Sequence, residues 1–173
     1  QMPRDQIVPT HVNRTADFSP VFEQAIAFAR KGGTIDMTCC VSRLDGNLTG
    51  VDVPDAVHRC LAEGVALENI TMSTDGNIPA TVRDAGGNAI GHRTVAPSVL
   101  WRDVVRLVGE DVLPLEKALT LATTNVARVL GLGSRKGRIA AGLDADFSLV
   151  GPDDTIRLVV AGGSVVFRAE ETH

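Results

Sequence analysis

The chain has 173 residues, of which 44% are hydrophobic and 22% charged, and its formal net charge of -4 gives a pI near 5.5. An acidic balance of this kind excludes a general nucleic-acid or anionic-membrane surface. No apolar run approaches the ~20 residues of a membrane-spanning helix, and residues 1–10 lack the apolar centre of a signal peptide. We therefore expect a soluble chain that binds neither nucleic acid nor membrane.

Strands and helices alternate along the first part of the chain. Three apolar or β-branched runs, residues 7–12, 33–40 and 70–74, are bounded by Gly, Asp or Asn and predict short buried strands. Amphipathic stretches over residues 19–31 and 53–64 predict helices between them, the first with a serine N-cap and a proline at its first position. This alternation indicates parallel βα units.

The pattern changes after residue 74. Residues 75–94 are polar and contain several glycines, so we expect a long loop there, followed by helices over 97–108 and 115–130. From 134 to 173, short apolar runs are separated by Gly-Leu-Asp, Gly-Pro-Asp-Asp and Gly-Gly turns, which predicts antiparallel strands. A domain boundary is therefore placed near Gly133.

The predicted fold class is α/β, but its sheets are incomplete. Three βα units over residues 1–133 cannot close a barrel, which takes eight. Residues 134–173 make only part of a β-sandwich or open barrel. The sequence thus indicates the carboxyl-terminal part of a larger architecture.

The three cysteines are Cys39, Cys40 and Cys60. They form neither a disulfide framework nor the paired spacing of a structural zinc site. Because two of them are adjacent in a predicted buried strand, we expect buried free thiols, which favour the cytoplasm as the compartment of the protein.

Two segments place candidate metal ligands at the ends of predicted strands. "PTHVNR" carries His11, with Asn13 expected on the same strand face and Arg14 just beyond the strand. "STDGN" carries Asp75. Each alone is compatible with a structural role, His11 as a strand-end histidine and Asp75 as a turn residue. Together, at equivalent ends of parallel strands, they could share a divalent ion, and Asp75 could take a proton from metal-bound water.

The other histidines are weaker candidates. His58 lies in a predicted helix and is expected at the surface, His92 lies in the predicted polar loop, and His173 is the last residue. The sequence contains no His-x-His, no His-Glu-x-x-His, no Gly-x-Ser-x-Gly elbow and no glycine-rich phosphate loop after a strand.

Four segments of the chain are together similar to a known family. "PTHVNR", "FARKGGTIDMT", "STDGN" and "KGRIAAGLDADFSLV", in this order, resemble the carboxyl-terminal half of bacterial isoaspartyl (β-aspartyl) dipeptidases of the amidohydrolase superfamily. The resemblance implies a distorted (β/α)8 TIM barrel with two zinc ions, and a small β-sandwich. Residues 1–133 would supply barrel strands six to eight, and residues 134–173 part of the sandwich.

The resemblance also implies a role for each candidate residue. His11 would ligate the second zinc ion, and Arg14 would hold a carboxylate of the dipeptide substrate. Asp75 would ligate the first zinc ion, act as general base toward the bridging hydroxide, and later protonate the leaving amine. The expected reaction is hydrolysis of the amide between an aspartate side-chain carboxyl and the next residue.

Several parts of such a site have no counterpart in this chain. The family's His-x-His of strand one, its bridging carboxylated lysine and its strand-five histidine are absent. We therefore expect the missing N-terminal half of the same protein to be a partner and this chain alone to be inactive. The resemblance also implies that the complete protein forms a homo-oligomer.

One departure from the family opens two alternatives. The family follows its Asp-Gly-Asn with Gly-Ser, whereas this chain continues with Ile78 and Pro79, which removes a hydroxyl and an N–H donor. A related amidohydrolase that cleaves another amide, such as an N-acyl amino acid, is therefore one alternative. A non-catalytic fragment that needs a partner half to cover its exposed strand edge is the other.

Overall fold

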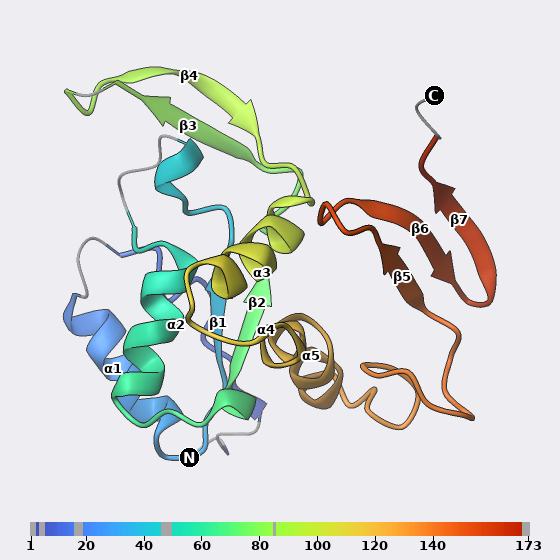
Figure 1. The fold of residues 1–173 in the computed structure, drawn as a ribbon. Helices are drawn as coiled ribbons and strands as arrows, with labels where there is room; N and C mark the ends of the chain where they lie inside the picture. Colours follow the sequence, from blue (N-terminus) through green and yellow to red (C-terminus); the bar gives the residue numbers. More distant parts are fainter. Residues whose placement is uncertain (1–2, 4–5, 16–18, 46–49, 85, 171–173) are drawn as a thin grey trace.

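The structure of the chain is a computed structural model, which describes residues 3, 6–15, 19–45, 50–84 and 86–170 (Figure 1). The helices and strands in these ranges follow in the order α1 (Pro20–Ala29), β1 (Ile35–Thr38), η2 (Arg43–Asp45), α2 (Val53–Ala62), η3 (Leu67–Asn69), β2 (Ile70–Ser73), β3 (Pro79–Arg83), β4 (Ala89–Thr94), α3 (Val99–Gly109), α4 (Leu115–Ala122), α5 (Thr124–Val129), β5 (Phe147–Val150), β6 (Ile156–Ala161) and β7 (Ser164–Arg168). In none of the described ranges is a helix long and apolar enough to cross a membrane.

A pair of parallel strands lies among the helices of the first part of the chain (Figure 1). β1 pairs with β2, with Ile35 opposite Ile70 and Thr38 opposite Ser73. Helix α2 contacts β1, and α4 and α5 contact β2. The parallel arrangement predicted for the strands around residues 35 and 70 is therefore confirmed.

The core lies between these strands and the helices, because the apolar residues of each helix recur on one face. Its largest fully buried side chains include Phe22, Ile35, Met37, Ile70, Leu107 and Leu121. The three cysteines lie in this core as free thiols, as predicted. Burial raises the pKa of the Cys60 thiol to about 12, so that thiol stays protonated at neutral pH.

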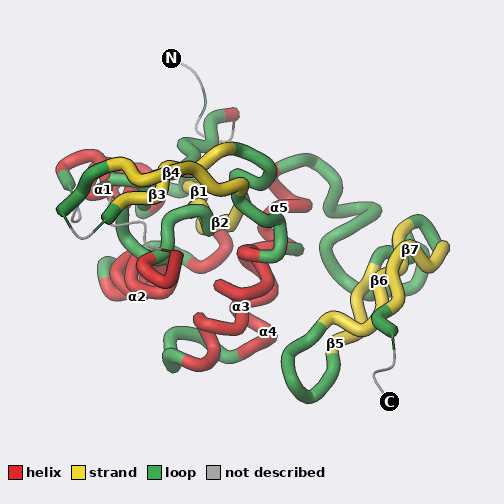
Figure 2. Tube along the Cα trace, turned by 90° about the horizontal axis from the view of Figure 1, so that it is seen from above, coloured by secondary structure: helices red, strands yellow, loops and turns green. Residues whose placement is uncertain are grey.

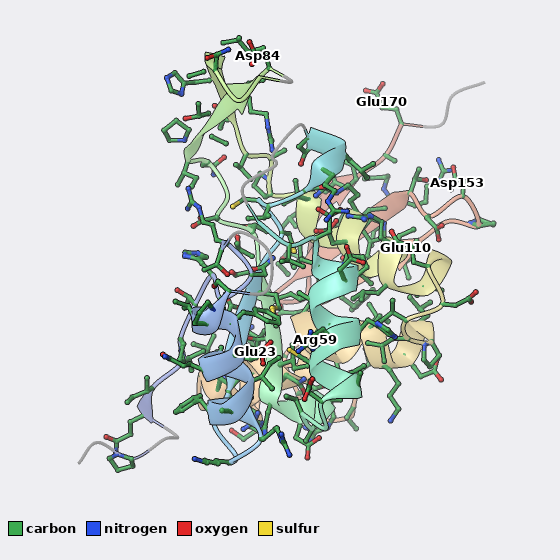
Figure 3. The ribbon with its side chains drawn as sticks, turned by 90° about the vertical axis from the view of Figure 1, so that its left-hand side faces the viewer. Glu23, Arg59, Asp84, Glu110, Asp153 and Glu170 are labelled. Carbon is green, nitrogen blue, oxygen red and sulfur yellow. The ribbon has the colours of Figure 1, made fainter. Side chains whose placement is uncertain are left out.

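Helices α1 and α2 are also joined at the surface, where Arg59 on α2 lies beside Glu23 on α1 (Figure 3). The Arg59 guanidinium is 2.9 Å from a carboxylate oxygen of Glu23 and 3.1 Å from one of Glu63. Exposed pairs of this kind contribute little to stability individually. The apolar residues that both helices bury in the core therefore contribute more to stability than this surface cluster does.

Residues 7–12 do not form the strand that the sequence predicts. Their backbone runs beside β1, since the Asp36 N–H donates to the Pro9 carbonyl at 2.9 Å and the Val12 N–H donates to the Asp36 carbonyl at 3.2 Å. Pro9 has no N–H to donate, and His11 turns the chain with a φ of 56°. The ladder is therefore too short and too irregular for a strand.

The long loop predicted over 75–94 is wrong, because most of it is an antiparallel hairpin of β3 and β4. Thr81 lies opposite His92 in the register, so His92 is on a strand. The turn is built around Asp84, whose carboxylate accepts the Gly86 N–H at 2.9 Å. The side chains of β4 are mostly exposed, and the two strands therefore lack the alternating apolar pattern that identifies a half-buried strand.

The single helix predicted over 115–130 is two helices, α4 and α5. The break falls at Thr123, whose φ of -128° and ψ of -85° are not helical. The Thr123 hydroxyl donates to the Leu119 carbonyl at 2.7 Å, and the Thr124 hydroxyl donates to the Gly137 carbonyl at 2.7 Å. Threonine hydroxyls compete in this way with regular helix hydrogen bonds.

The last part of the chain forms a sheet of its own, in the order β5-β6-β7 (Figure 2). Both pairs are antiparallel, as the turns in this part of the sequence predict. The indole N–H of Trp101 on α3 donates to the Asp154 carbonyl at 2.5 Å, which links this sheet to the helices. His173 lies outside the described residues.

Candidate metal and substrate site

A cavity of about 530 Å³ lies along β2 and reaches its carboxyl end. The side chains that line it come from the segment before β1, from β1 and β2, and from α5: Val8, Thr10, His11, Asp36, Thr71, Met72, Ser73, Thr74, Asp75, Val126, Val129 and Leu130. Ligand sites of parallel sheets are typically built at the carboxyl ends of the strands. The polar end of this cavity is therefore the candidate site.

His11 and Asp75 meet at this end of the strands, where His11 Nε2 lies 3.1 Å from Asp75 Oδ1. Both residues have left-handed backbones, with φ of 56° and 52°, a conformation that is uncommon outside glycine. Local hydrogen bonds hold both turns: the Arg14 N–H donates to the His11 carbonyl at 2.9 Å, and the Gly76 N–H donates to the Thr74 hydroxyl at 3.0 Å. Two turns, rather than regular strand geometry, thus aim the imidazole at the carboxylate.

Asn13 does not share a face with His11, contrary to the alternation predicted for a strand. The Asn13 side chain is fully buried. Its amide donates to the Thr38 carbonyl at 3.0 Å and to the Val51 carbonyl at 2.9 Å, and its oxygen accepts the Thr38 N–H at 2.8 Å. The left-handed turn at His11 breaks the alternation, so Asn13 ties the segment to β1 and does not contribute to the cavity.

Two further groups contact the second oxygen of Asp75. Arg14 Nη1 lies 3.4 Å from Asp75 Oδ2, and Cys40 Sγ lies 3.6 Å from the same oxygen. Burial raises the pKa of the Cys40 thiol, so the thiol is the donor in this contact. Sequence reasoning missed Cys40 as a member of the site, although its position just beyond the end of β1 is the signal that indicates it.

A buried carboxyl group lies deeper in the cavity. Asp36 on β1 accepts the Thr71 hydroxyl on one oxygen at 2.9 Å and the Ser73 hydroxyl on the other at 2.6 Å. Burial raises the pKa of Asp36, against the lowering effect of these hydrogen bonds and of nearby His11. Sequence reasoning missed this cluster too. Two features of the sequence indicate it: Thr71 and Ser73 alternate with apolar residues in β2, and Asp36 interrupts the apolar run of β1.

The raised pKa of Asp36 predicts a pH dependence of the free energy of unfolding. The folded chain holds this proton more tightly than the unfolded chain, so this contribution to stability is lost as the pH rises from 3.8 through the folded pKa. The Asp36→Asn variant cannot ionise, and we expect it to gain stability relative to the wild type across that window. Urea unfolding at intervals from about pH 3.5 to pH 7 measures the difference.

Asp84 provides a control of opposite sign, because hydrogen bonds from Asn88 lower its pKa. Asp84→Asn should lose stability relative to the wild type as the pH rises through the lowered folded pKa to 3.8, so its profile must be extended to more acidic pH. Parallel pH profiles for Asp36→Asn and the wild type would contradict the buried, protonated carboxyl group.

The imidazole and carboxylate groups of the site are suitable as part of the ligand set of a zinc ion. Zinc binds imidazole nitrogen and carboxylate oxygen, and His11 and Asp75 supply one of each at contact distance. In the part of the chain that the structure describes, no three His, Cys, Asp or Glu side chains are grouped to hold a metal ion. His58, on α2, and His92, on β4, do not line the cavity. The described part of the chain therefore offers two ligands, His11 and Asp75.

Comparisons with known proteins identify the family and the fold of the chain. The model of the amidohydrolase family matches residues 15–166. The solved β-aspartyl dipeptidase of Fervidobacterium islandicum AW-1, in complex with a β-Asp-Leu dipeptide, is 33% identical, with a TM-score of 0.76 over 97% of this chain and 41% of that chain. An N-acetylglucosamine-6-phosphate deacetylase from Pasteurella multocida has the same fold, with a TM-score of 0.65 at 16% identity over 91% of this chain and 44% of that chain.

A curated relative matches a shorter part of the chain. An imidazolonepropionase from Thermoplasma volcanium is 40% identical over 63 residues, which are 30% of this chain and 16% of that protein. The chain therefore spans less than half the length of the proteins it resembles. The family match nevertheless covers most of the chain, from Thr15, just after the "PTHVNR" segment, to Val166 in β7. The chain belongs to the amidohydrolase family.

Proposed function

We propose that this chain supplies the carboxyl-terminal half of the active site of a zinc-dependent β-aspartyl dipeptidase. The observation that carries the proposal is the convergence of His11 and Arg14 on Asp75, at 3.1 and 3.4 Å. An imidazole and a carboxylate can hold a metal ion, and a guanidinium binds carboxylates in two-pronged geometry. The 33% identity to a β-aspartyl dipeptidase supports this substrate class.

In the proposed reaction each residue acts through atoms that already face the site. Arg14, whose side chain is half exposed, turns its guanidinium from Asp75 to a carboxylate of the dipeptide. His11 and Asp75 would hold the zinc, which when bound would supply a water molecule of lowered pKa and a Lewis acid for the scissile carbonyl. Asp75 takes the proton of the attacking water as the new C–O bond forms, and gives it to the amine nitrogen as the C–N bond breaks.

The rest of the site would come from the N-terminal half of the same protein. In this proposal the irregular segment of residues 7–12 takes the place of strand six of a TIM barrel, β1 and β2 are strands seven and eight, and residues 134–173 form part of a β-sandwich. The 41% coverage of the solved dipeptidase supports this assignment. So does the arrangement of β1 and β2, which form a sheet of two described strands where a barrel needs eight. The complete protein would be a cytoplasmic homo-oligomer that acts on a small dipeptide.

A specific observation favours a second candidate, an amidohydrolase of N-acyl amino acids. Ile78 packs against the hydrophobic core, and Pro79 is the first residue of β3. Neither can donate a hydrogen bond from a side chain to a substrate, whereas the dipeptidase pattern has a serine here. A site without this hydroxyl is less selective for the additional polar groups of a β-aspartyl dipeptide.

Parallel turnover assays separate the candidates. The native polypeptide that contains this chain is purified from its source, its intact mass is recorded, and it is assayed with β-Asp-Leu and with an N-acetyl amino acid. The proposal expects zinc-dependent hydrolysis of β-Asp-Leu, with a kcat/KM at least about tenfold higher than for the N-acetyl substrate. The opposite preference would support the second candidate.

A third outcome would exclude both enzymes as properties of this polypeptide. A mass near the 18.3 kDa of this chain, together with no turnover of either substrate, would indicate a non-catalytic fragment. Mixing the chain with an N-terminal half and zinc then tests whether two halves form an active enzyme. Hydrolysis in the mixture would restore the dipeptidase proposal, and its absence would overturn it.

A further inference from the structure

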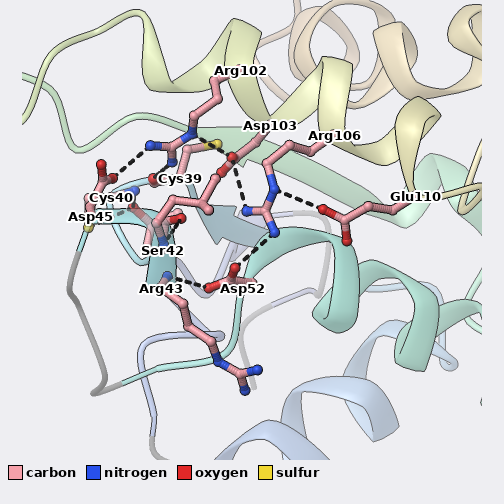
Figure 4. Close-up of polar contacts among 12 residues, drawn as sticks. Cys39, Cys40, Ser42, Arg43, Asp45, Asp52, Arg102, Asp103, Arg106 and Glu110 are labelled. Atoms are coloured by element: carbon pink, nitrogen blue, oxygen red, sulfur yellow. Dashed lines mark hydrogen bonds and ion pairs between the residues drawn. The ribbon is translucent and has the colours of Figure 1, made fainter.

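A network of charged side chains joins α3 to the segment that follows β1 (Figure 4), and Arg93 extends it to the hairpin that follows β2. Asp45, at the end of η2, accepts a hydrogen bond from Arg102 Nη1 at 2.7 Å, and Arg93 Nη2 of β4 lies 3.1 Å from the same oxygen. Arg102 also donates to the Cys39 carbonyl at 3.1 Å and to the Asp103 carboxylate at 2.9 Å. One carboxylate thus bridges an arginine of the hairpin and an arginine of the helix.

The burial of these groups makes the bridge stronger than an ordinary surface ion pair. The side chains of Asp45, Arg93 and Arg102 are 22%, 27% and 26% exposed, and Asp103 is fully buried. Charges in such positions are screened less by salt than exposed ones. Removal of the Asp45 charge leaves two partly buried guanidinium groups without this shared partner, which is the costly way to break an ion pair.

Both bridged segments leave the strands at the candidate site. The segment that contains Asp45 begins next to Cys40, whose thiol contacts Asp75. The hairpin follows the turn of Asp75 directly, and its base is held where the Asn77 N–H donates to the Val95 carbonyl at 2.8 Å. A displacement of the hairpin is therefore passed to the backbone of Asp75.

A separate ion pair, formed by Asp52, lies at the carboxyl end of the segment that contains Asp45. Asp52 Oδ2 lies 2.9 Å from Arg106 Nη2 of α3, and Asp52 Oδ1 accepts the Arg43 N–H at 2.9 Å. Neither contact involves the hairpin. Asp45 and Asp52 thus lie on the same segment, and each pairs with an arginine of α3. In the described contacts, only Asp45 also pairs with an arginine of the hairpin.

We propose that Asp45 is a positioning residue that holds the β3–β4 hairpin against α3 and thereby keeps the Asp75 turn in place. Asp45 touches no reacting atom, and its catalytic consequence rests on the proposed function. Its role in holding the hairpin does not depend on the proposed function, because the contacts with Arg93 and Arg102 lie within this chain.

Hydrogen exchange of the free chain tests this role. In Asp45→Asn, which keeps the size of the side chain, we expect the amides of β3 and β4 to exchange roughly tenfold faster, while those of β1 and β2 keep their rates. Asp45→Glu should restore most of the protection, since it keeps the charge. Asp52→Asn is the matched control, and it should leave the hairpin rates unchanged.

Two results would overturn the proposal: unchanged hairpin rates in Asp45→Asn, or an equal increase across β1, β2 and the hairpin, which would indicate general destabilisation. Arg93→Gln approaches the same contact from the other side if Asp45→Asn does not fold. It should produce a similar increase in hairpin exchange. An Arg93→Gln protein with wild-type hairpin rates would overturn the proposal independently.

Kinetics of the native polypeptide then test the link to Asp75. We expect Asp45→Asn to lower kcat/KM for β-Asp-Leu roughly tenfold at a temperature where the variant is still fully folded, with recovery in Asp45→Glu. Unchanged kcat/KM in a protein with a loosened hairpin would overturn this link. If the wild type hydrolyses no dipeptide, the proposed function fails, and the exchange data still decide the role of Asp45.

Discussion

Replacement of Asp75 by asparagine is expected to lower kcat for β-Asp-Leu hydrolysis by about 10²- to 10⁴-fold in the native polypeptide, the range typical of a lost general base. Asparagine keeps the size of the side chain but cannot take a proton from water. It also removes the anionic group on which His11, Arg14 and Cys40 converge. Steady-state assays measure kcat, and the zinc content of the purified protein should fall in parallel.

The matched control for this prediction is Asp84→Asn. Asp84 lies at the far tip of the β3–β4 hairpin (Figure 3), away from the residues that line the cavity. Its replacement should leave kcat within about twofold of the wild type. Removal of zinc by a chelator should abolish turnover in the wild type, and added zinc should restore it. A kcat of Asp75→Asn within about tenfold of the wild-type value would exclude Asp75 as the base.

That His11 and Asp75 lie near each other could be predicted from the sequence, because the order of the segments places both residues at one edge of the central strands; the contact itself also needs the two left-handed turns. Two β-branched runs separated by an amphipathic helix fold as parallel neighbours, as the register of Ile35 with Ile70 shows, and residues just beyond such strands gather at one edge. The amidohydrolase resemblance depended on the same short segments. Short sequence patterns were therefore sufficient to predict the parallel arrangement of β1 and β2 and to select the two candidate ligands.

Features that depend on a single backbone torsion or on distant contacts could not be predicted in this way. The left-handed φ of His11 reverses the face on which Asn13 lies, and no pattern of residue types signals it. Beside the break at Thr123, the Thr124 hydroxyl donates to the Gly137 carbonyl, a partner 13 residues away in the sequence. The side chains of β4 are mostly exposed, so the hairpin lacks the alternation of apolar and polar residues that would identify its strands in the sequence.

Charged side chains that join distant segments were equally inaccessible. Arg93, in a segment predicted to be a loop, and Asp45 are brought together only by the fold. A lone aspartate or arginine in a polar stretch is most often a solvated surface residue. The network around Asp45 therefore becomes visible only in the structure, whereas the candidate ligands are visible in both.

The largest expected effect on stability comes from Asn13. Asn13→Ala removes two hydrogen bonds donated by the side-chain amide and one that its oxygen accepts, and leaves the buried Thr38 N–H and two carbonyls without these partners. Each unsatisfied buried group costs about 1–3 kcal/mol, so we expect the free energy of unfolding to fall by roughly 3 kcal/mol. Urea unfolding, followed by the fluorescence of Trp101, the single tryptophan, measures the loss.

Asn88→Ala is the control, because among the described residues the Asn88 amide donates to Asp84 at the exposed hairpin turn, and its loss should cost less than about 1 kcal/mol. A loss in Asn13→Ala no larger than in this control would contradict the buried role of Asn13. The backbone carbonyl of Asn13 also accepts the Val51 N–H at 2.8 Å, so this residue joins the segment of His11 to the segment after η2. Because Asn13 lies two residues after the left-handed His11, the position of the imidazole depends on an amide that itself takes no part in the chemistry.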